Sequence, residues 1–450
     1  MSFDLIVRGG TLVTPDGVRR ADLGISGGQI VEVSEEITAD GTVFDARGLQ
    51  IFPGVLDAHV HLNEPGRTHW EGFGTGTRAL AAGGATSFFD MPLNSSPPVL
   101  DRATFEAKRE IGEQKSLIDF GLWGGLTPLN LDRMDELAEC GVIGFKAFMS
   151  HSGLDEFPAV DDTALYEGLK TAARLNLVVA THAESDNLTR HFTEQARAGG
   201  GHSVRDYLGT RPVVAELEAV QRALLYAGEL GARLHLVHLS SGAAVAMAFE
   251  ARQRGVDVSI ETCAHYLHFT DEDVEKMGAL LKCAPPLRSQ AVQDNLWDEL
   301  LAGHVDIVGS DHSPAPPDRK TSENFFALWG GISGAQSTLN VLLTGGHHQR
   351  GLPLEAAAAL SALNPARRFG IEQKGALEVG LDADFAVVDL GHEFELTELY
   401  DRWKQNPYRG AKFRGLVQST YSRGRRVYQD GKFDDSVRGQ LLRPGAQSGR

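Results

Sequence analysis

Histidine, lysine and aspartate side chains close several apolar runs of this chain, and their spacing is typical of a metal site. His59 and His61 stand one residue apart at the end of the run that begins at Ile51. Side chains alternate between the two faces of a β-strand, so both imidazoles project from one face and can reach one cation. A His-x-His pair is a weak signal in a chain with 16 histidines. Its meaning depends on what the other runs carry.

Four further polar side chains lie in or at the end of other apolar runs. They are Lys146, His182, His238 and Asp311. Imidazole nitrogen and carboxylate oxygen are both ligands that zinc accepts. A single histidine at a strand end is more often structural, but six such groups on five strands together predict a metal centre.

Lys146 needs a separate explanation, because an ammonium group beside metal cations is electrostatically unfavourable. A lysine in an apolar strand loses hydration of its charged form, which lowers its pKa. The neutral amine can react with carbon dioxide to give a carbamate, whose two oxygens can bridge two metal ions. An ion pair with a neighbouring acid is the alternative for Lys146. Beside four histidines and Asp311, we favour the carbamate.

Eight short apolar runs alternate with helical stretches and supply the scaffold for these groups. Alternation of strands and helices predicts a parallel sheet, and eight strands predict a closed (β/α)8 TIM barrel of the α/β class. The candidate groups then lie toward the carboxyl ends of the strands, where barrel enzymes build their sites. A doubly wound open sheet is the alternative, but Gly72–Gly76 is more typical of a flexible loop than of a phosphate cradle. The runs are Ile51–His59, Ala85–Met91, Asp119–Leu126, Val142–Met149, Leu177–His182, Leu234–Leu239, Val256–Thr262 and Val305–Asp311.

Both ends of the chain have β character punctuated by glycine. Residues 1–50 and 375–450 are predicted to form one small β-sandwich domain, and residues 51–374 the barrel. Residues from about 436 onward are expected to form a poorly ordered tail.

Composition limits the possible partners. The formal charge of −17 argues against nucleic acid and anionic membranes, and slightly favours a neutral small-molecule substrate. Three cysteines predict no disulfide framework and suit a reducing cytoplasm. No apolar run approaches the roughly 20 residues that a membrane helix needs. We therefore expect a cytoplasmic location.

The six candidate ligands resemble those of the binuclear amidohydrolase superfamily, in its cyclic-amide branch of dihydroorotases, hydantoinases or dihydropyrimidinases, and allantoinases. The resemblance spans nearly the whole chain, including the split β-domain. The runs His69-Trp70-Glu71-Gly72 and Met91-Pro92-Leu93-Asn94 are similar to allantoinases in particular. The runs Pro285–Arg288 and Ser310–Pro314 are shared more widely.

The resemblance implies hydrolysis of a cyclic amide at two divalent metal ions, zinc by default, with cobalt, manganese or iron as alternatives. It assigns His59, His61 and Asp311 to one ion and His182 and His238 to the other. Carboxylated Lys146 would bridge both, and Asp311 would pass a proton from water to the leaving nitrogen. A homotetramer is the expected assembly. A scaffold protein without activity is the contrasting hypothesis, but all six ligand positions are filled.

Position 63 separates the possible substrates. Many dihydroorotases have an arginine in this place of the motif, which holds the substrate carboxylate in a bidentate clamp. This chain has Asn63, which suits a neutral ureide such as allantoin, although a turn-capping role would also explain an asparagine. The run Phe148–Ser152 lacks the tyrosine that hydantoinases place beyond the lysine. We expect conversion of allantoin to allantoate, with hydantoinase as the alternative and dihydroorotase less favoured.

Further expectations concern residues around the ligands. The resemblance implies substrate contacts at Asn63, Asn94, Cys283, Ala284, Ser313 and Gly331, with backbone groups serving at Cys283, Ala284 and Gly331. His265 is either structural or a support for the ligands. His235 lies on the opposite strand face from His238 and is not expected to be a ligand.

Overall fold

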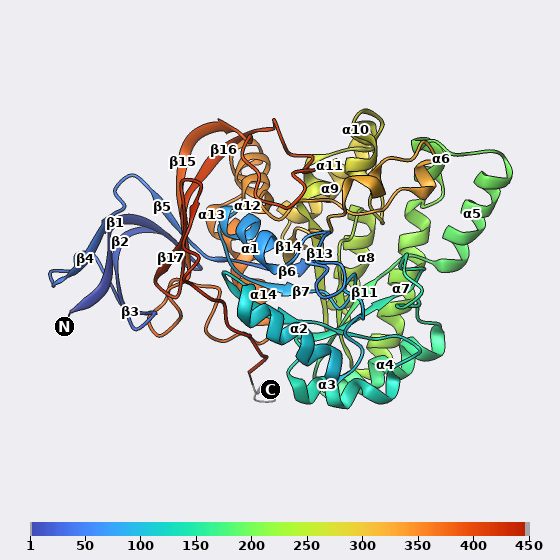
Figure 1. Ribbon diagram of the computed structural model, residues 1–450, viewed down its shortest axis with the longest axis horizontal. Coiled ribbons are helices and arrows are strands. Elements are labelled where there is room, and N and C mark those ends of the chain that lie inside the picture. The colour runs from blue at the N-terminus through green and yellow to red at the C-terminus, as the bar shows by residue number, and fades with distance from the viewer. Residues whose placement is uncertain (1, 446–450) are drawn as a thin grey trace.

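The computed structural model describes residues 2–445, in which a helix-ringed parallel barrel stands beside a β-rich unit built from both chain ends (Figure 1). Strands β6–β8 form one hydrogen-bonded group and β9–β14 another, and the consecutive β8 and β9 share the third barrel position. A parallel bridge between Val60 and His312 joins the first strand to the segment after the last. These contacts confirm the predicted (β/α)8 barrel. Its strands are β6 (Val55–Val60), β7 (Ala85–Asp90), β8 (Asp119–Leu122), β9 (Gly124–Gly125), β10 (Gly144–Phe148), β11 (Val178–His182), β12 (Arg233–Leu236), β13 (Val258–Cys263) and β14 (Ile307–Gly309).

The helices between these strands begin and end at local sequence signals. Helix α2 (Arg102–Lys115) begins after Asp101, whose carboxylate accepts a hydrogen bond from Thr104 N in a capping box. Helices α3 (Met134–Cys140) and α7 (Val213–Leu230) end at glycines with positive φ. The other principal helices of the barrel are α1 (Phe73–Ala82), α4 (Asp162–Arg174), α5 (Asp186–Ala198), α6 (Val204–Gly209), α8 (Gly242–Gln253), α11 (Gln290–Leu301) and α14 (Asn364–Arg368).

The two chain ends share one nine-stranded sheet rather than two separate sheets. Its order is β18-β17-β16-β15-β5-β1-β2-β3, with β4 paired to β1. Leu23, Ile51 and Phe385 are buried in the core of this unit. The strands are β1 (Phe3–Thr14), β2 (Gly17–Ser26), β3 (Gln29–Ser34), β4 (Gly41–Asp45), β5 (Gln50–Pro53), β15 (Phe385–Glu395), β16 (Lys412–Ser422), β17 (Arg425–Gln429) and β18 (Lys432–Phe433).

The run predicted as the first barrel strand divides at Gly54. Residues Gln50–Pro53 form β5 and pair with β1 and β15 of the terminal sheet, while β6 begins the barrel at Val55. A Cβ atom at Gly54 would lie 2.2 Å from the hydroxyl oxygen of Thr86. The chain therefore crosses between the two units at a position where a side chain has no room.

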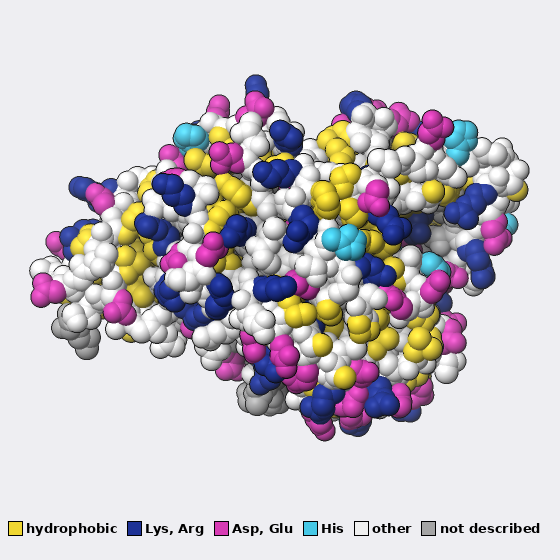
Figure 2. Space-filling view, viewed as in Figure 1, with side chains coloured by type: hydrophobic (Ala, Val, Ile, Leu, Met, Phe, Trp, Pro, Cys, Tyr) yellow, Lys and Arg dark blue, Asp and Glu magenta, His cyan; other side chains and the backbone are white. Residues whose placement is uncertain are grey.

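The expectation of a disordered tail from residue 436 is wrong for residues 436–445. Phe120 N donates to Gln440 O at 3.0 Å and Leu442 N donates to Phe120 O at 2.7 Å, so this segment runs along β8. Residues 446–450 lie outside the described residues. On the face shown in Figure 2, acidic and basic side chains are interspersed, with hydrophobic ones scattered among them. Among the described residues, no helix combines the length and apolar character that crossing a membrane requires.

Candidate metal centre

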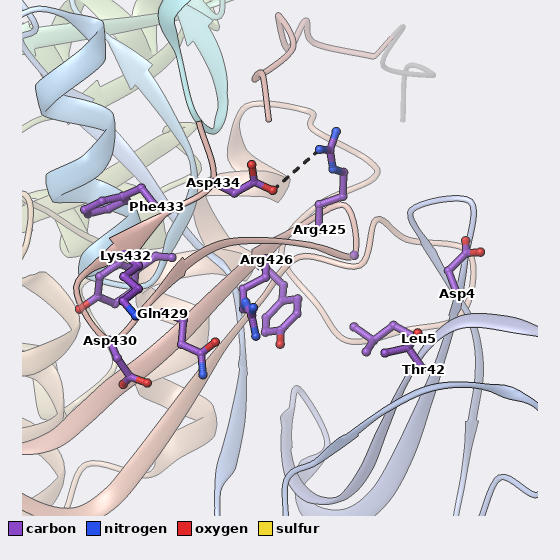
Figure 3. Close-up of a pocket in the computed structure, with 13 residues that line it drawn as sticks. Asp4, Leu5, Thr42, Arg425, Arg426, Gln429, Asp430, Lys432, Phe433 and Asp434 are labelled. Atoms are coloured by element: carbon purple, nitrogen blue, oxygen red, sulfur yellow. Dashed lines mark ion pairs between the residues drawn. The ribbon is translucent and has the colours of Figure 1, made fainter. Parts of the chain in front are cut away.

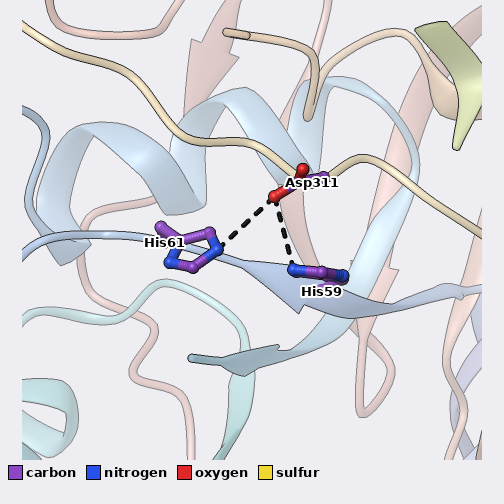
Figure 4. A group of neighbouring side chains, drawn as sticks. All are labelled: His59, His61 and Asp311. Carbon is purple, nitrogen blue, oxygen red and sulfur yellow. Dashed lines mark ion pairs between the residues drawn. The ribbon is translucent and has the colours of Figure 1, made fainter. Parts of the chain in front are cut away.

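The structure brings His59, His61 and Asp311 together from the first and last barrel positions (Figure 4). Asp311 Oδ1 lies 3.3 Å from His59 Nε2 and 3.4 Å from His61 Nε2. The two histidine side chains are buried, whereas that of Asp311 retains 14% of its exposure. Two imidazole nitrogens and one carboxylate oxygen therefore converge at the inner end of a cavity.

Hydrogen bonds on the far side of each ring orient these two histidines. His59 Nδ1 lies 2.9 Å from Glu261 Oε1, and His61 Nδ1 lies 2.9 Å from Leu93 O. Leu93 O can only accept, so His61 Nδ1 carries the proton and Nε2 has the lone pair; His59 takes the same tautomer when Glu261 is ionised. This is the arrangement by which outer acceptors fix metal-binding histidines.

His182 and His238 form the second half of the site. His182 Nδ1 lies 3.1 Å from His238 Nε2, and His182 Nε2 lies 2.9 Å from Glu184 Oε2. Glu184 is paired in turn with Arg211. Burial lowers the pKa of His182, and it lowers those of His59 and His238 well below the ordinary value. Neutral imidazole is the form that binds metals, so the donor set fits divalent cations.

Lys146 lies between these two halves in β10, and its surroundings are the strongest support for a bridged centre. Its side chain is completely buried, and its Nζ has no hydrogen-bond partner among the described residues. Burial lowers the pKa of the amine to about 8. A neutral amine without a partner can be carboxylated, and the resulting anion would balance cations held by the histidines.

Two of the ligands lie on strained backbone. His238 has a φ of 42° and Asp311 a φ of 44°, in the left-handed region that residues other than glycine seldom occupy. Such strain collects at functional sites, where the surrounding structure holds it in place. Here it turns side chains that follow β12 and β14 toward a common point.

The six candidate ligands line one cavity of about 720 Å³ at the carboxyl ends of the strands. Five of the six expected substrate contacts line the same cavity: Asn94, Cys283, Ala284, Ser313 and Gly331. Asn94 Nδ2 donates to Ser313 Oγ at 3.3 Å, so these two side chains come from facing loops. The cavity therefore joins the metal ligands to polar groups that suit an amide-rich substrate.

Asn63 does not belong to this lining, so the expectation that it contacts the substrate is corrected. Its side chain is fully buried, and its Nδ2 donates to Pro314 O at 3.2 Å. Its φ of 66° is left-handed, a conformation that asparagine tolerates in turns. Its Oδ1 has no hydrogen-bond partner among the described residues, so a turn-capping role of the side chain stays a prediction.

Two lysines, the buried Lys282 and the half-buried Lys320, hold the backbone that forms the outer wall of the cavity. Lys282 Nζ donates to Phe325 O at 2.7 Å and to Leu328 O at 2.6 Å. Lys320 Nζ donates to Gly331 O at 2.7 Å. The expected backbone contacts at residues 283, 284 and 331 are thereby fixed relative to one another.

Three carboxylates that support the ligands were missed by the sequence analysis: Asp57, Glu184 and Glu261. Asp57 lies two residues from His59 on the same face of β6, and Glu184 lies two residues beyond His182, where β11 ends; this spacing could have revealed them. Glu261 stands in the apolar run of the seventh strand, and a carboxylate in such a run signals a buried partner. Burial raises the pKa of Glu261 to about 8.

Two histidines near the candidate ligands, His235 and His265, are not among them. His235 points away from the ligands, and its Nε2 lies 3.1 Å from Glu261 Oε2, as expected for a residue that is not a ligand. His265 is buried, and neither ring nitrogen has a hydrogen-bond partner among the described residues.

An acidic cluster and a second hollow lie outside this cavity. Asp119, Asp382 and Asp384 form an acidic cluster, but Lys374 Nζ lies within 2.8 Å of a carboxylate oxygen of each, so an ammonium group already occupies their centre. A hollow of about 810 Å³ in the terminal β-unit contains Arg425, Arg426 and Phe433 (Figure 3). None of the six candidate ligands lines that hollow.

Comparison with known proteins agrees with this geometry. The model of the amidohydrolase family matches residues 50–427. The chain is 72% identical to an allantoinase of Deinococcus radiodurans, with 99% of each chain covered, and 54% identical to an allantoinase of Solibacter usitatus, with 99% of this chain and 98% of the relative covered.

Among solved structures, an L-hydantoinase (dihydropyrimidinase) from Arthrobacter aurescens superposes with a TM-score of 0.95 at 33% identity, covering 98% of this chain and 100% of the other. The expected resemblance is confirmed over the full length of the barrel and the terminal unit. The chain belongs to the amidohydrolase family and is a cyclic amidohydrolase.

Proposed function

We propose that this enzyme hydrolyses the cyclic amide bond of allantoin to give allantoate. The observation that carries the proposal is the 72% identity to an allantoinase over nearly the whole of both chains. The cavity supports it, because Asn94 and Ser313 offer uncharged donors and acceptors suited to a neutral ureide. Hydantoinase activity is the alternative, and it is supported by the resemblance in fold to an L-hydantoinase at 33% identity.

The proposal includes two divalent metal ions, zinc by default, held by the six ligands. His59, His61 and Asp311 would hold one ion, His182 and His238 the other, and carboxylated Lys146 would bridge them. When bound, such ions supply an activated water and polarise the amide carbonyl. Their presence is supported by the neutral, converging imidazoles and by the buried Lys146 amine without a partner.

The residues of the chain divide the remaining work. Of His59, His61 and Asp311, Asp311 has the most exposed side chain in the cavity, so its carboxylate is placed to take a proton from water and return it to the leaving nitrogen. The pKa of Asp311 is below its ordinary value: burial pushes it up, but His61, His265 and Lys146 outweigh burial. A proton taken up at Asp311 is therefore readily released to an amide nitrogen, which is a poor leaving group until protonated.

The proposal also places the enzyme in the cytoplasm as a homotetramer. The size of the assembly is tested by light scattering of the purified chain. Metal identity is tested by elemental analysis after purification without chelator.

A panel of allantoin, dihydroorotate, dihydrouracil and phenylhydantoin, assayed with zinc- and cobalt-loaded protein, tests the activity. Allantoin should be turned over with the highest kcat/KM. Turnover of dihydrouracil or phenylhydantoin without turnover of allantoin would overturn the proposal in favour of a hydantoinase.

A further inference from the structure

Glu261 lies between the two halves of the site and contacts both. Its Oε1 lies 2.9 Å from His59 Nδ1, in the half that contains Asp311. The same oxygen accepts a hydrogen bond at 3.2 Å from the backbone N–H of His238, in the other half. Its Oε2 lies 3.1 Å from His235 Nε2. The Glu261 side chain is fully buried, so these three contacts replace the water that it would otherwise bind.

We infer that Glu261 is a positioning residue that couples the two metal subsites, because one carboxylate orients a ligand of each. The inference rests on the binuclear centre proposed above. In the first subsite Glu261 fixes the tautomer of His59, so that Nε2 presents a lone pair toward Asp311. In the second it holds the peptide of His238, whose left-handed φ of 42° aims the imidazole at His182.

A carboxylate suits this position because the backbone N–H of His238, and Nδ1–H of His59 in the tautomer that presents Nε2 to a metal ion, both point at Glu261 Oε1. An ionised glutamate accepts hydrogen bonds at both oxygens and presents no donor. A glutamine of the same shape offers one neutral oxygen to His59 and His238, which accepts hydrogen bonds more weakly than a carboxylate and does less to raise the basicity of the His59 ring. Glu261→Gln therefore disturbs the orientation of the ligands without opening a cavity.

Glu184 offers a matched comparison within the same site. It is also a fully buried carboxylate, but it contacts only one ligand, His182, through Nε2 at 2.9 Å. Glu216 is a second comparison, buried away from the ligands, where it accepts from Ser240 and Ser241. The three glutamates share burial and differ in how many metal subsites they touch: two, one and none.

The test measures metal affinity rather than turnover. Glu261→Gln, Glu184→Gln and Glu216→Gln are stripped with chelator and titrated with zinc by equilibrium dialysis and elemental analysis. Cobalt absorption spectra report the geometry of each subsite. We expect Glu261→Gln to weaken binding of both ions by about 10- to 100-fold. Glu184→Gln should weaken binding of one ion, and Glu216→Gln should bind both as the unaltered protein does, with an unchanged cobalt spectrum.

Several results would overturn the inference. Wild-type affinity for both ions in Glu261→Gln would do so, as would loss of only one ion in the pattern of Glu184→Gln. If Glu261→Gln does not fold, Glu261→Asp is measured in the same way. The shorter carboxylate cannot reach both partners, so undiminished binding of both ions would refute coupling. Fewer than two ions bound by the unaltered protein would instead remove the binuclear centre on which the inference rests.

Discussion

Replacing Lys146 by methionine should affect the metal-free and the metal-loaded protein in opposite directions. Methionine keeps the length and apolar stem of lysine but cannot be carboxylated. In the metal-free protein the Lys146 amine is buried without a polar partner, and burial lowers its pKa from 10.5 to about 8. At roughly 1.4 kcal/mol per pKa unit, this shift corresponds to about 3 kcal/mol of destabilisation.

The sign follows from the depressed pKa. Below about pH 8 the unfolded chain holds the lysine proton more tightly than the folded protein does, so the whole penalty is present at pH 7. The penalty disappears as the pH rises from about 8 to 10.5. Metal-free Lys146→Met should therefore exceed the wild type in free energy of unfolding at pH 7, by up to about 3 kcal/mol. Metal-loaded wild type should be the more stable of the two loaded proteins, because Lys146→Met lacks the bridge.

The assay is urea unfolding in carbonate-free buffer at pH 7, with chelator or with zinc, alongside elemental analysis. Lys108→Met is the control: Lys108 Nζ lies 2.6 Å from Asp90 Oδ2, and both side chains are fully buried. Removing Lys108 leaves Asp90 unpaired and should cost about 3–5 kcal/mol with or without metal. Two ions per chain in Lys146→Met, or a metal-free variant less stable than wild type, would refute the reasoning.

Three further outcomes are expected. Asp311→Asn should lower kcat by at least about 100-fold, because the amide cannot carry the transferred proton. Circular dichroism should show that the fold is retained. A wild-type kcat would show that Asp311 does not transfer the proton. Lys146→Ala should lose the second metal ion and regain it with added short-chain carboxylic acids, as measured by elemental analysis; full occupancy without the acids would argue against the carbamate. Lys374→Met should lower the free energy of unfolding by about 3–5 kcal/mol in urea titrations, because it removes the ammonium group from among three aspartates. An unchanged free energy of unfolding would contradict the ion pairs seen in the structure.

The barrel and its candidate ligands could be predicted because they depend on local periodicity. The side chains of a strand repeat every two residues, so His59 and His61 lie on one face. The alternation of strands with helices places His182 and Asp311 at the same end of the barrel. The division of the first run at Gly54 could not be predicted in this way. It depends on Thr86, a residue of the neighbouring strand that only the folded barrel brings within reach.

The groups that the sequence analysis missed or misplaced depend on contacts across long stretches of chain. Glu261 meets His59 across 202 residues, and Asn63 meets Pro314 across 251. Neither pair lies within a single helix or strand, so the periodic pattern of one such element could not reveal it. Asn63 also carries a type of side chain that serves equally well in a turn or in a substrate contact, and only the structure shows that it is buried outside the cavity lining.

Net charge is a poor guide to the electrostatics of the cavity, although it suggested a neutral substrate. The chain carries −17 overall, yet besides Lys146 the cavity is lined by five basic residues against three acids: Arg190, Arg197, Arg211, Lys282 and Arg319 against Asp186, Glu194 and Asp311. At physiological salt, exposed charges farther away than about 8 Å are largely screened, so these arginines act on a bound molecule more than the distant acids do. Opening a cyclic amide creates a carboxylate where the substrate had none. The basic lining therefore suits the anionic product of the proposed reaction, which the composition of the whole chain gives no reason to expect.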